Sequence, residues 1–239
     1  MQFDRDAKTR IYWLGVLVFV ALMVLLYVSK QGSLVIVQSS SEDKIVKIHV
    51  EIPRLRNLKS VAFEQDINEE IESKIRQFVQ QIKSTSQEDF KSGIQRFPYE
   101  AYVKTQLRYN DGKIISFVVY YYGYTGGAHG STIFDTYNID IENLRVLKLY
   151  DIIQEDAEKV VKREIVRQIA ERKRDFFEDA TATVFSKDIS TMRFVISKEG
   201  ITFIFDQYEL APYSTGMPEF VLPWSILDGF LKININDNF

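Results

Sequence analysis

The residues best able to do chemistry lie in the stretch 120–130, which reads YYYGYTGGAHG. It contains His129, one of only two histidines in the chain. An imidazole activates a hydroxyl nucleophile when an acid orients it and all three groups lie within hydrogen-bond reach. The sequence does not show which groups lie within hydrogen-bond distance of His129, so several partners stay possible. The acid is Asp135, Glu209 or Glu219, and the hydroxyl comes from Ser131, Ser214 or Tyr213.

No catalytic motif strengthens this combination. The sequence has no nucleophile-elbow pattern, no HExxH and no P-loop. It has no cysteine, which excludes disulfides, thiolate nucleophiles and cysteine metal sites, and two histidines do not favour a zinc site. Among 33 acids no pair stands out for glycoside hydrolysis. We therefore expect no catalytic residue, no metal and no cofactor, although catalysis is not excluded.

The glycine-rich loop itself has two interpretations. Four glycines fall within residues 123–130, a density that indicates positive φ values or the close approach of another group. The loop is either a wide, bulged β-hairpin in which His129 caps a backbone group, or a recognition loop flanked by Tyr122 and Tyr124.

A second loop, residues 208–219, carries the large side chains of Tyr208, Tyr213 and Met217, and Pro212 and Pro218 stiffen its backbone. Such a loop is either a rigid aromatic binding surface or a loop tucked onto the sheet. If the two loops lie side by side, we expect the binding site where they meet. The predicted ligand-binding residues are Tyr122, Tyr124, Gly126, Gly127, His129, Tyr208, Pro212, Tyr213 and Met217.

Hydrophobic periodicity predicts the elements that position these loops. Apolar residues at steps of four and three over 63–82 predict an amphipathic helix, and Asn110-Asp111-Gly112 favours a two-residue hairpin turn. His49 falls on the partly polar face of a predicted strand, where we expect a solvated neighbour of the next strand. The expected elements are strands 34–37 and 44–52, helix 63–82, strands 99–109, 113–122 and 131–141, helix 151–178, strands 193–196, 201–205 and 220–222, and a helical turn at 223–227.

This order predicts an α+β fold: one antiparallel sheet with two main helices on one side, preceded by one transmembrane helix. The helix comes from an uncharged apolar run at residues 11–28, which reaches the length of a membrane span. Arg5, Lys8 and Arg10 precede it and place the N-terminus in the cytoplasm. We expect a cytoplasmic tail at 1–10, an anchor at 11–29 and an extracytoplasmic remainder. The alternative is a cleaved signal peptide. Signal peptides have a shorter apolar region than this run and end in a small-residue cleavage site, which residues 28–31 do not clearly offer.

Composition limits the partners. A net charge of −3 and a pI of about 5.6 argue against nucleic acid, which requires a basic face. The hydrophobic content of 46% and the charged content of 26% are typical of a folded globular protein. The mildly acidic extracytoplasmic part suits a basic partner without demanding one.

Three stretches together resemble the exported C-terminal domain of RsiV-type anti-sigma factors of Gram-positive bacteria. They are TGGAHG at 125–130, the passage 137–153 with LKLYD, and FDQYELAPY at 205–213 followed by VLPW. Residues 35–94 resemble the small strand–helix domain that also lies beside the catalytic domain of PdaC-type peptidoglycan deacetylases. The resemblance predicts a small domain at 33–95 and an RsiV-like domain at 96–239.

The resemblance implies a binding module. The exported domain of RsiV-type proteins resembles a receptor for lysozyme, and binding of lysozyme to it leads to release of a sigma factor. RsiV-type proteins carry a sigma-binding segment before the membrane helix, where this sequence has ten residues, so we expect no sigma binding. The expected function is a membrane-anchored extracytoplasmic sensor for a protein such as lysozyme, or for a cell-wall fragment. The alternatives are an enzyme or accessory domain acting on peptidoglycan, and a structural role in an envelope complex.

Overall fold

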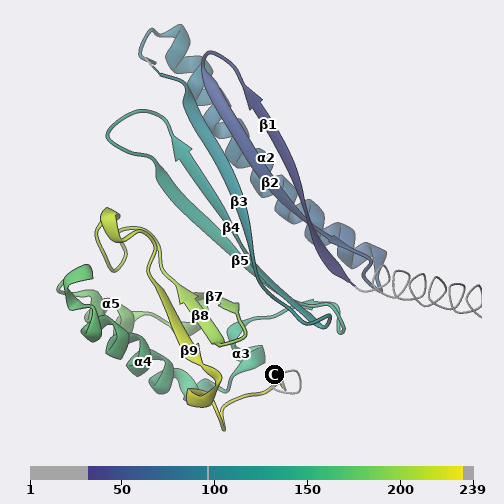
Figure 1. Ribbon diagram of the computed structural model, residues 1–239, viewed down its shortest axis with the longest axis vertical. Coiled ribbons are helices and arrows are strands. Elements are labelled where there is room, and N and C mark those ends of the chain that lie inside the picture. Colours follow the sequence, from purple (N-terminus) through teal and green to yellow (C-terminus); the bar gives the residue numbers. More distant parts are fainter. Residues whose placement is uncertain (1–31, 96, 234–239) are drawn as a thin grey trace, which may run out of the picture.

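Two β-sheets pack face to face with helices on their outer sides, which gives four layers (Figure 1). This computed structural model describes residues 32–95 and 97–233. The outermost layers are helix α2 (Val61–Lys91) on one side and helices α4 (Glu158–Glu171) and α5 (Ala180–Ser186) on the other. The α+β class predicted from the sequence is confirmed.

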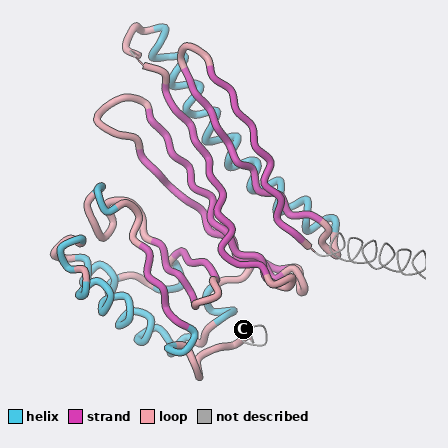
Figure 2. The backbone as a smooth tube through the Cα atoms, in the orientation of Figure 1, coloured by secondary structure: helices cyan, strands magenta, loops and turns pink. Residues whose placement is uncertain are grey.

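The large sheet has the strand order β1-β2-β3-β4-β5-β6, and its long central strands run side by side (Figure 2). All neighbouring pairs are antiparallel except β2 and β3, which are parallel. Its strands are β1 (Ser33–Glu42), β2 (Val46–Arg56), β3 (Tyr99–Asn110), β4 (Ile114–Tyr124), β5 (Ser131–Asp140) and β6 (Arg145–Val146).

The small sheet contains β7 (Arg193–Ile196), β8 (Gly200–Ile204) and β9 (Glu219–Pro223), all antiparallel. It lies between the large sheet and α4 with α5. The expectation of one antiparallel sheet with both main helices on one side is therefore wrong. The last three strands form their own sheet, and α2 and α4 cover opposite outer faces.

The parallel pair arises because α2 carries the chain back from the end of β2 to the start of β3, as parallel neighbours require. Ser60 begins this helix by accepting the N–H of Phe63, and the isoleucines of its apolar stripe are buried. The second predicted helix, 151–178, is shorter in the structure. A separate turn, α3 (Leu149–Ile152), precedes α4, and 3₁₀ turns at Glu155–Ala157 and Lys173–Asp175 flank it.

Strand β4 contributes to the cores on both faces of the large sheet. Ile115, Phe117 and Val119 are fully buried on the face that α2 covers. Val118 lies between them in sequence and is fully buried on the other face, where it packs with Val195 of the small sheet. Because successive residues of a strand point to opposite faces, one nearly continuous apolar run fills two cores.

The predicted tail at 1–10 and anchor at 11–29 lie outside the described residues. Within 32–95 and 97–233, none of the helices combines the length and apolarity needed to cross a membrane. The predicted boundary at residues 95 and 96 falls in the connection between α2 and β3. Strands on both sides of it pair in one sheet.

Candidate binding site

The two loops singled out in the sequence lie side by side. The glycine loop, residues 125–130, connects β4 to β5, and residues 205–218 connect β8 to β9. The side chain of Gln207 accepts the backbone N–H of Thr132 at 2.9 Å. The Tyr208 hydroxyl lies 3.2 Å from Nε2 of His129. Two segments about 80 residues apart in sequence therefore form one surface.

Three rings form the centre of this surface, and we call His129, Tyr208 and Tyr213 the aromatic cluster. The His129 ring stacks on Tyr213 with centroids 3.9 Å apart and planes inclined by 21°. Tyr208 completes the cluster 5.9 Å from Tyr213, with 54% of its surface exposed. His129 is also exposed. Tyr213 is partly buried. Two exposed rings that are supported by a third, with polar edges, suit binding to a ligand that offers both apolar and polar groups.

Hydrogen bonds fix the orientation of the imidazole. Nδ1 of His129 lies 2.9 Å from the carbonyl oxygen of Gly130. A carbonyl only accepts, so Nδ1 carries a proton and Nε2 is the nitrogen that meets the Tyr208 hydroxyl. The ring is thereby held by both nitrogens.

Tyrosines and glycines together shape the glycine loop. A Cβ at Gly130 would lie 2.4 Å from ring carbons of Tyr122, so the ring of Tyr122 occupies the space that a side chain would need. Gly126 and Gly127 have φ values of +99° and +93° with open space around them, so backbone conformation alone selects glycine there. The hydroxyl of Tyr124 donates to the carbonyl of Gly127 at 3.0 Å.

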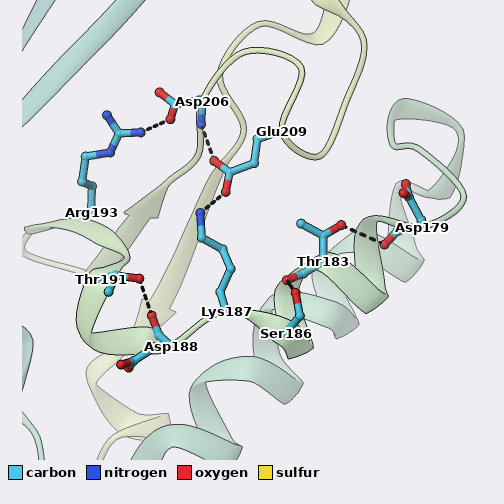
Figure 3. A network of polar contacts seen from close by, with 9 residues as sticks. All are labelled: Asp179, Thr183, Ser186, Lys187, Asp188, Thr191, Arg193, Asp206 and Glu209. Carbon is cyan, nitrogen blue, oxygen red and sulfur yellow. Dashed lines mark hydrogen bonds and ion pairs between the residues drawn. The ribbon is translucent and has the colours of Figure 1, made fainter.

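Ion pairs hold Asp206 and Glu209 of the second loop (Figure 3). Arg193 of β7 pairs with Asp206, and Lys187 pairs with Glu209. The carboxylate of Glu209 also accepts the backbone N–H of Asp206 at 2.9 Å. Tyr208 between them has a φ of +64°, which is costly for a residue with a side chain and persists only where the surroundings impose it.

The remaining two predicted binding residues lie at the edges of the site. Pro212 immediately precedes the 3₁₀ turn Tyr213–Thr215 that carries Tyr213. Met217 is partly buried and packs on the cluster between the two sheets, which includes Val118 and Val195. Its place is beneath the loop, where it attaches the loop to the core.

The acids considered as partners of His129 lie elsewhere. Asp135 accepts from Tyr121 and faces Lys74 of α2, at 3.1 and 3.5 Å. Glu209 pairs with Lys187, as described above, and Glu219 pairs with Arg108. Among the described residues none of the three carboxylates is a hydrogen-bond partner of His129. The site offers aromatic surface and polar edges, and no acid within the described part of the chain orients its histidine.

The residues that position the site are not among those predicted from the sequence. Gln207, Lys187 and Arg193 act on the loop across long sequence separations, and no local pattern indicates such contacts. Gln207 does lie within the stretch at 205–213 that carries the family resemblance.

Two protein-family models match separate parts of the chain. Residues 39–132 match the family described as deacetylase PdaC, and residues 150–225 match a family described as a protein of unknown function, DUF3298. The peptidoglycan-N-acetylmuramic acid deacetylase PdaC of Bacillus subtilis (strain 168) is 26% identical over 208 residues. That alignment covers 85% of this chain and 43% of the deacetylase, so the chain spans less than half the length of this relative.

Two solved structures share the fold. A DUF3298 family member from Bacteroides fragilis NCTC 9343 superposes with a TM-score of 0.61 at 20% identity, covering 86% of this chain and 96% of the other. One from Pseudomonas aeruginosa PAO1 gives 0.56 at 21% identity, covering 84% and 94%. The resemblance to PdaC-type proteins is thus supported, and the match at 39–132 runs past residue 95 into β3, β4 and β5. The RsiV-type assignment stays a prediction.

Proposed function

We propose that this chain is a non-catalytic binding module of the cell envelope and that the aromatic cluster contacts its ligand. The observation that carries the proposal is the stacking of His129 on Tyr213 at 3.9 Å, with Tyr208 hydrogen-bonded to the same imidazole. We further propose the location predicted from the sequence: an anchor at 11–29, a cytoplasmic N-terminus and an extracytoplasmic main part.

The cluster suits binding because it is rigid before any ligand arrives. Aromatic side chains bury large areas at a small cost in side-chain entropy, and a surface already held in place loses little further freedom on binding. Ion pairs fix Asp206 and Glu209 on either side of Tyr208, and both nitrogens of His129 are engaged. Exposed rings held in this way are typical of residues that dominate binding energy.

The name of one relative suggests peptidoglycan as the ligand. The relative from Bacillus subtilis is named a peptidoglycan deacetylase, and this chain spans 43% of its length. We carry over the polymer and not the reaction, because no acid among the described residues orients His129. The proposed ligand is therefore cell-wall glycan, bound without chemical change.

Co-sedimentation with purified peptidoglycan tests this proposal. The full-length chain in mild detergent is expected to sediment with the insoluble polymer. Tyr213→Ala is expected to weaken binding about tenfold or more, since losing a stacked ring and its buried area costs on the order of 1.4 kcal/mol. The control is Phe185→Ala on α5, which removes an exposed aromatic ring outside the site. An unchanged affinity in a folded Tyr213→Ala protein would refute the role of the cluster.

Two further assays separate the alternatives. Calorimetry with a C-type lysozyme tests the receptor function that the RsiV-type resemblance implies, and micromolar binding there without binding to peptidoglycan would favour a protein partner. Acetate release from peptidoglycan tests the enzyme alternative. Release by the wild-type chain that His129→Ala abolishes would overturn the non-catalytic assignment.

A further inference from the structure

One row of side chains crosses four strands of the large sheet at the level of the aromatic cluster. The strand register pairs Ser40 with His49, His49 with Tyr102, and Tyr102 with Tyr122. Residues directly opposite each other on neighbouring strands point to the same face. These side chains therefore line one face, and we call His49, Tyr102 and Tyr122 the aromatic row.

Each member of the row contacts the next. Oγ of Ser40 lies 2.9 Å from Nδ1 of His49, and the His49 ring lies 5.1 Å from that of Tyr102. Tyr102 and Tyr122 stack with centroids 5.8 Å apart and planes inclined by only 11°. The row is thus a continuous ladder of rings across β2, β3 and β4.

The row leads directly into the aromatic cluster. The ring of Tyr122 lies against Gly130, the residue that follows His129. Next along the register is Thr132 of β5, whose backbone N–H binds Gln207 of the second loop. The two histidines of the chain thus lie toward opposite ends of one aromatic surface.

A groove of about 310 Å³ opens over the far end of the row, lined among others by Gln38, Ser40, His49, Glu51, Tyr102 and Lys104. This volume is at the lower end of the range typical for small-ligand sites, ~300–1,000 Å³. Charged side chains of both signs, Glu51 and Lys104, border the rings. Burial, and then the Glu100 carboxylate, raise the pKa of the Tyr102 phenol, which stays protonated and able to donate.

We propose that the groove is a second subsite and that, with the aromatic row and the aromatic cluster, it forms one track for an extended glycan chain that crosses the strands. The proposal rests on the proposed function and names its ligand as a polymer of several sugar units. Sugars present apolar C–H faces to rings and hydroxyls to polar groups at the rim, and this surface supplies both.

The dimensions and charges of the track favour this occupant. Neighbouring strands lie ~4.8 Å apart, close to the length of one sugar unit in an extended chain, so β1 to β5 span about 19 Å. The charged residues beside the row are two lysines and three glutamates, so their formal charges nearly cancel and sum to −1. They are Glu42, Lys47 and Glu100 on one side, and Glu51 and Lys104 on the other. A hydroxyl-rich chain suits such a surface better than a strongly basic protein.

Oligomers of β-linked N-acetylglucosamine test the track, with the two-unit and five-unit sugars titrated into the full-length chain. The five-unit sugar is expected to bind at least tenfold tighter than the two-unit sugar. Tyr102→Ala and His49→Ala are expected to remove most of this gain and to leave the two-unit sugar unaffected. Tyr213→Ala is expected to weaken both.

Two variants control for folding and specificity. Tyr102→Phe keeps the ring and is expected to retain most of the gain with length. Ile133→Ala changes an exposed side chain on the opposite face of the sheet and is expected to change nothing.

Equal affinity for the two sugars, or a gain with length that survives Tyr102→Ala, overturns the track. Sensitivity to Tyr213→Ala would then still support the proposed function. If neither sugar binds, the track is refuted, and binding to intact peptidoglycan decides the proposed function separately.

Discussion

Arg108 of β3 donates a hydrogen bond from Nη2 to Oε1 of Glu219 on β9, at 2.5 Å across the interface of the two sheets. The same guanidinium donates to the hydroxyl of Tyr120 at 2.9 Å. Arg108 is the extra residue of a β-bulge, since Leu107 pairs with Phe117 and Tyr109 with Ser116. The bulge turns Tyr109 toward the core of the small sheet. A local irregularity of one strand thus joins the two halves of the fold.

Glu219→Gln is expected to lower the free energy of unfolding by about 2–4 kcal/mol, because it leaves a largely buried guanidinium without its charged partner. Urea unfolding, monitored by circular dichroism, measures this free energy of unfolding. Glu199→Gln, at an exposed position on the β7–β8 turn, serves as the control and is expected to change stability by less than about 0.5 kcal/mol. Equal effects of the two substitutions would contradict a special role for the ion pair.

Gly130→Ala is expected to destabilise the protein by about 1–3 kcal/mol and to weaken ligand binding, because the added methyl group meets the ring of Tyr122. Thermal unfolding of the single variants Gly130→Ala and Tyr122→Ala and of the double variant measures their coupling. The double variant is expected to be more stable than the sum of the single losses predicts. Simple additivity would show that the two residues do not interact.

Tyr208→Gly is expected to be more stable than Tyr208→Ala by about 1 kcal/mol, because glycine adopts the φ of +64° without steric cost. Both variants lose the ring, so both are expected to bind peptidoglycan more weakly than the wild type. Chemical unfolding compares their stabilities. A more stable alanine variant would show that the left-handed backbone at this position is not imposed by the fold.

Asp140 makes the stability of the fold depend on pH. Burial alone would raise the pKa of this carboxyl, but hydrogen bonds from Asn143 and Arg145 outweigh burial and lower it. A depressed folded-state pKa contributes stability above the unfolded value, ~3.9 for aspartate, and this is lost as pH falls through the folded-state pKa. Asp140→Asn is therefore expected to be less stable than the wild type at pH 7 and to approach it in acid.

Unfolding free energies at pH 7 and at about pH 3 test this dependence. Asp228→Asn, at an exposed position, provides the control. A stability difference between Asp140→Asn and the wild type that does not shrink in acid would rule out Asp140 as a source of the dependence.

Local patterns predicted most of the elements, but not which strands pair. The apolar stripe from Ile67 to Ile82 and the Asn110-Asp111-Gly112 turn act within a few residues. The helix and the hairpin are confirmed, although three residues, 111–113, connect the two strands where a two-residue turn is predicted. The parallel pairing of β2 with β3 depends on where a 31-residue helix returns the chain, which alternation does not encode. The second helix was predicted too long because apolar residues such as Phe176 continue its spacing beyond a 3₁₀ turn.

The candidate site was predictable by residue type and not by arrangement. Aromatic and glycine content singled out both loops, but only the fold shows that His129 stacks on Tyr213. His49 looked like a solvated strand residue, and its contact with Tyr102 depends on the parallel pairing that the sequence did not reveal. The supports Arg193 and Lys187 carry no local signal, because their partners were chosen by tertiary packing.

The double burial of β4 also determines where this fold can diversify. A single inserted or deleted residue within the strand would exchange Phe117 with Val118 between two cores of different shape, so selection must keep its length constant. The glycine loop that follows is not subject to this register constraint at Gly126 and Gly127, which face open space. Its length can therefore vary at these two positions while both sheets stay in register.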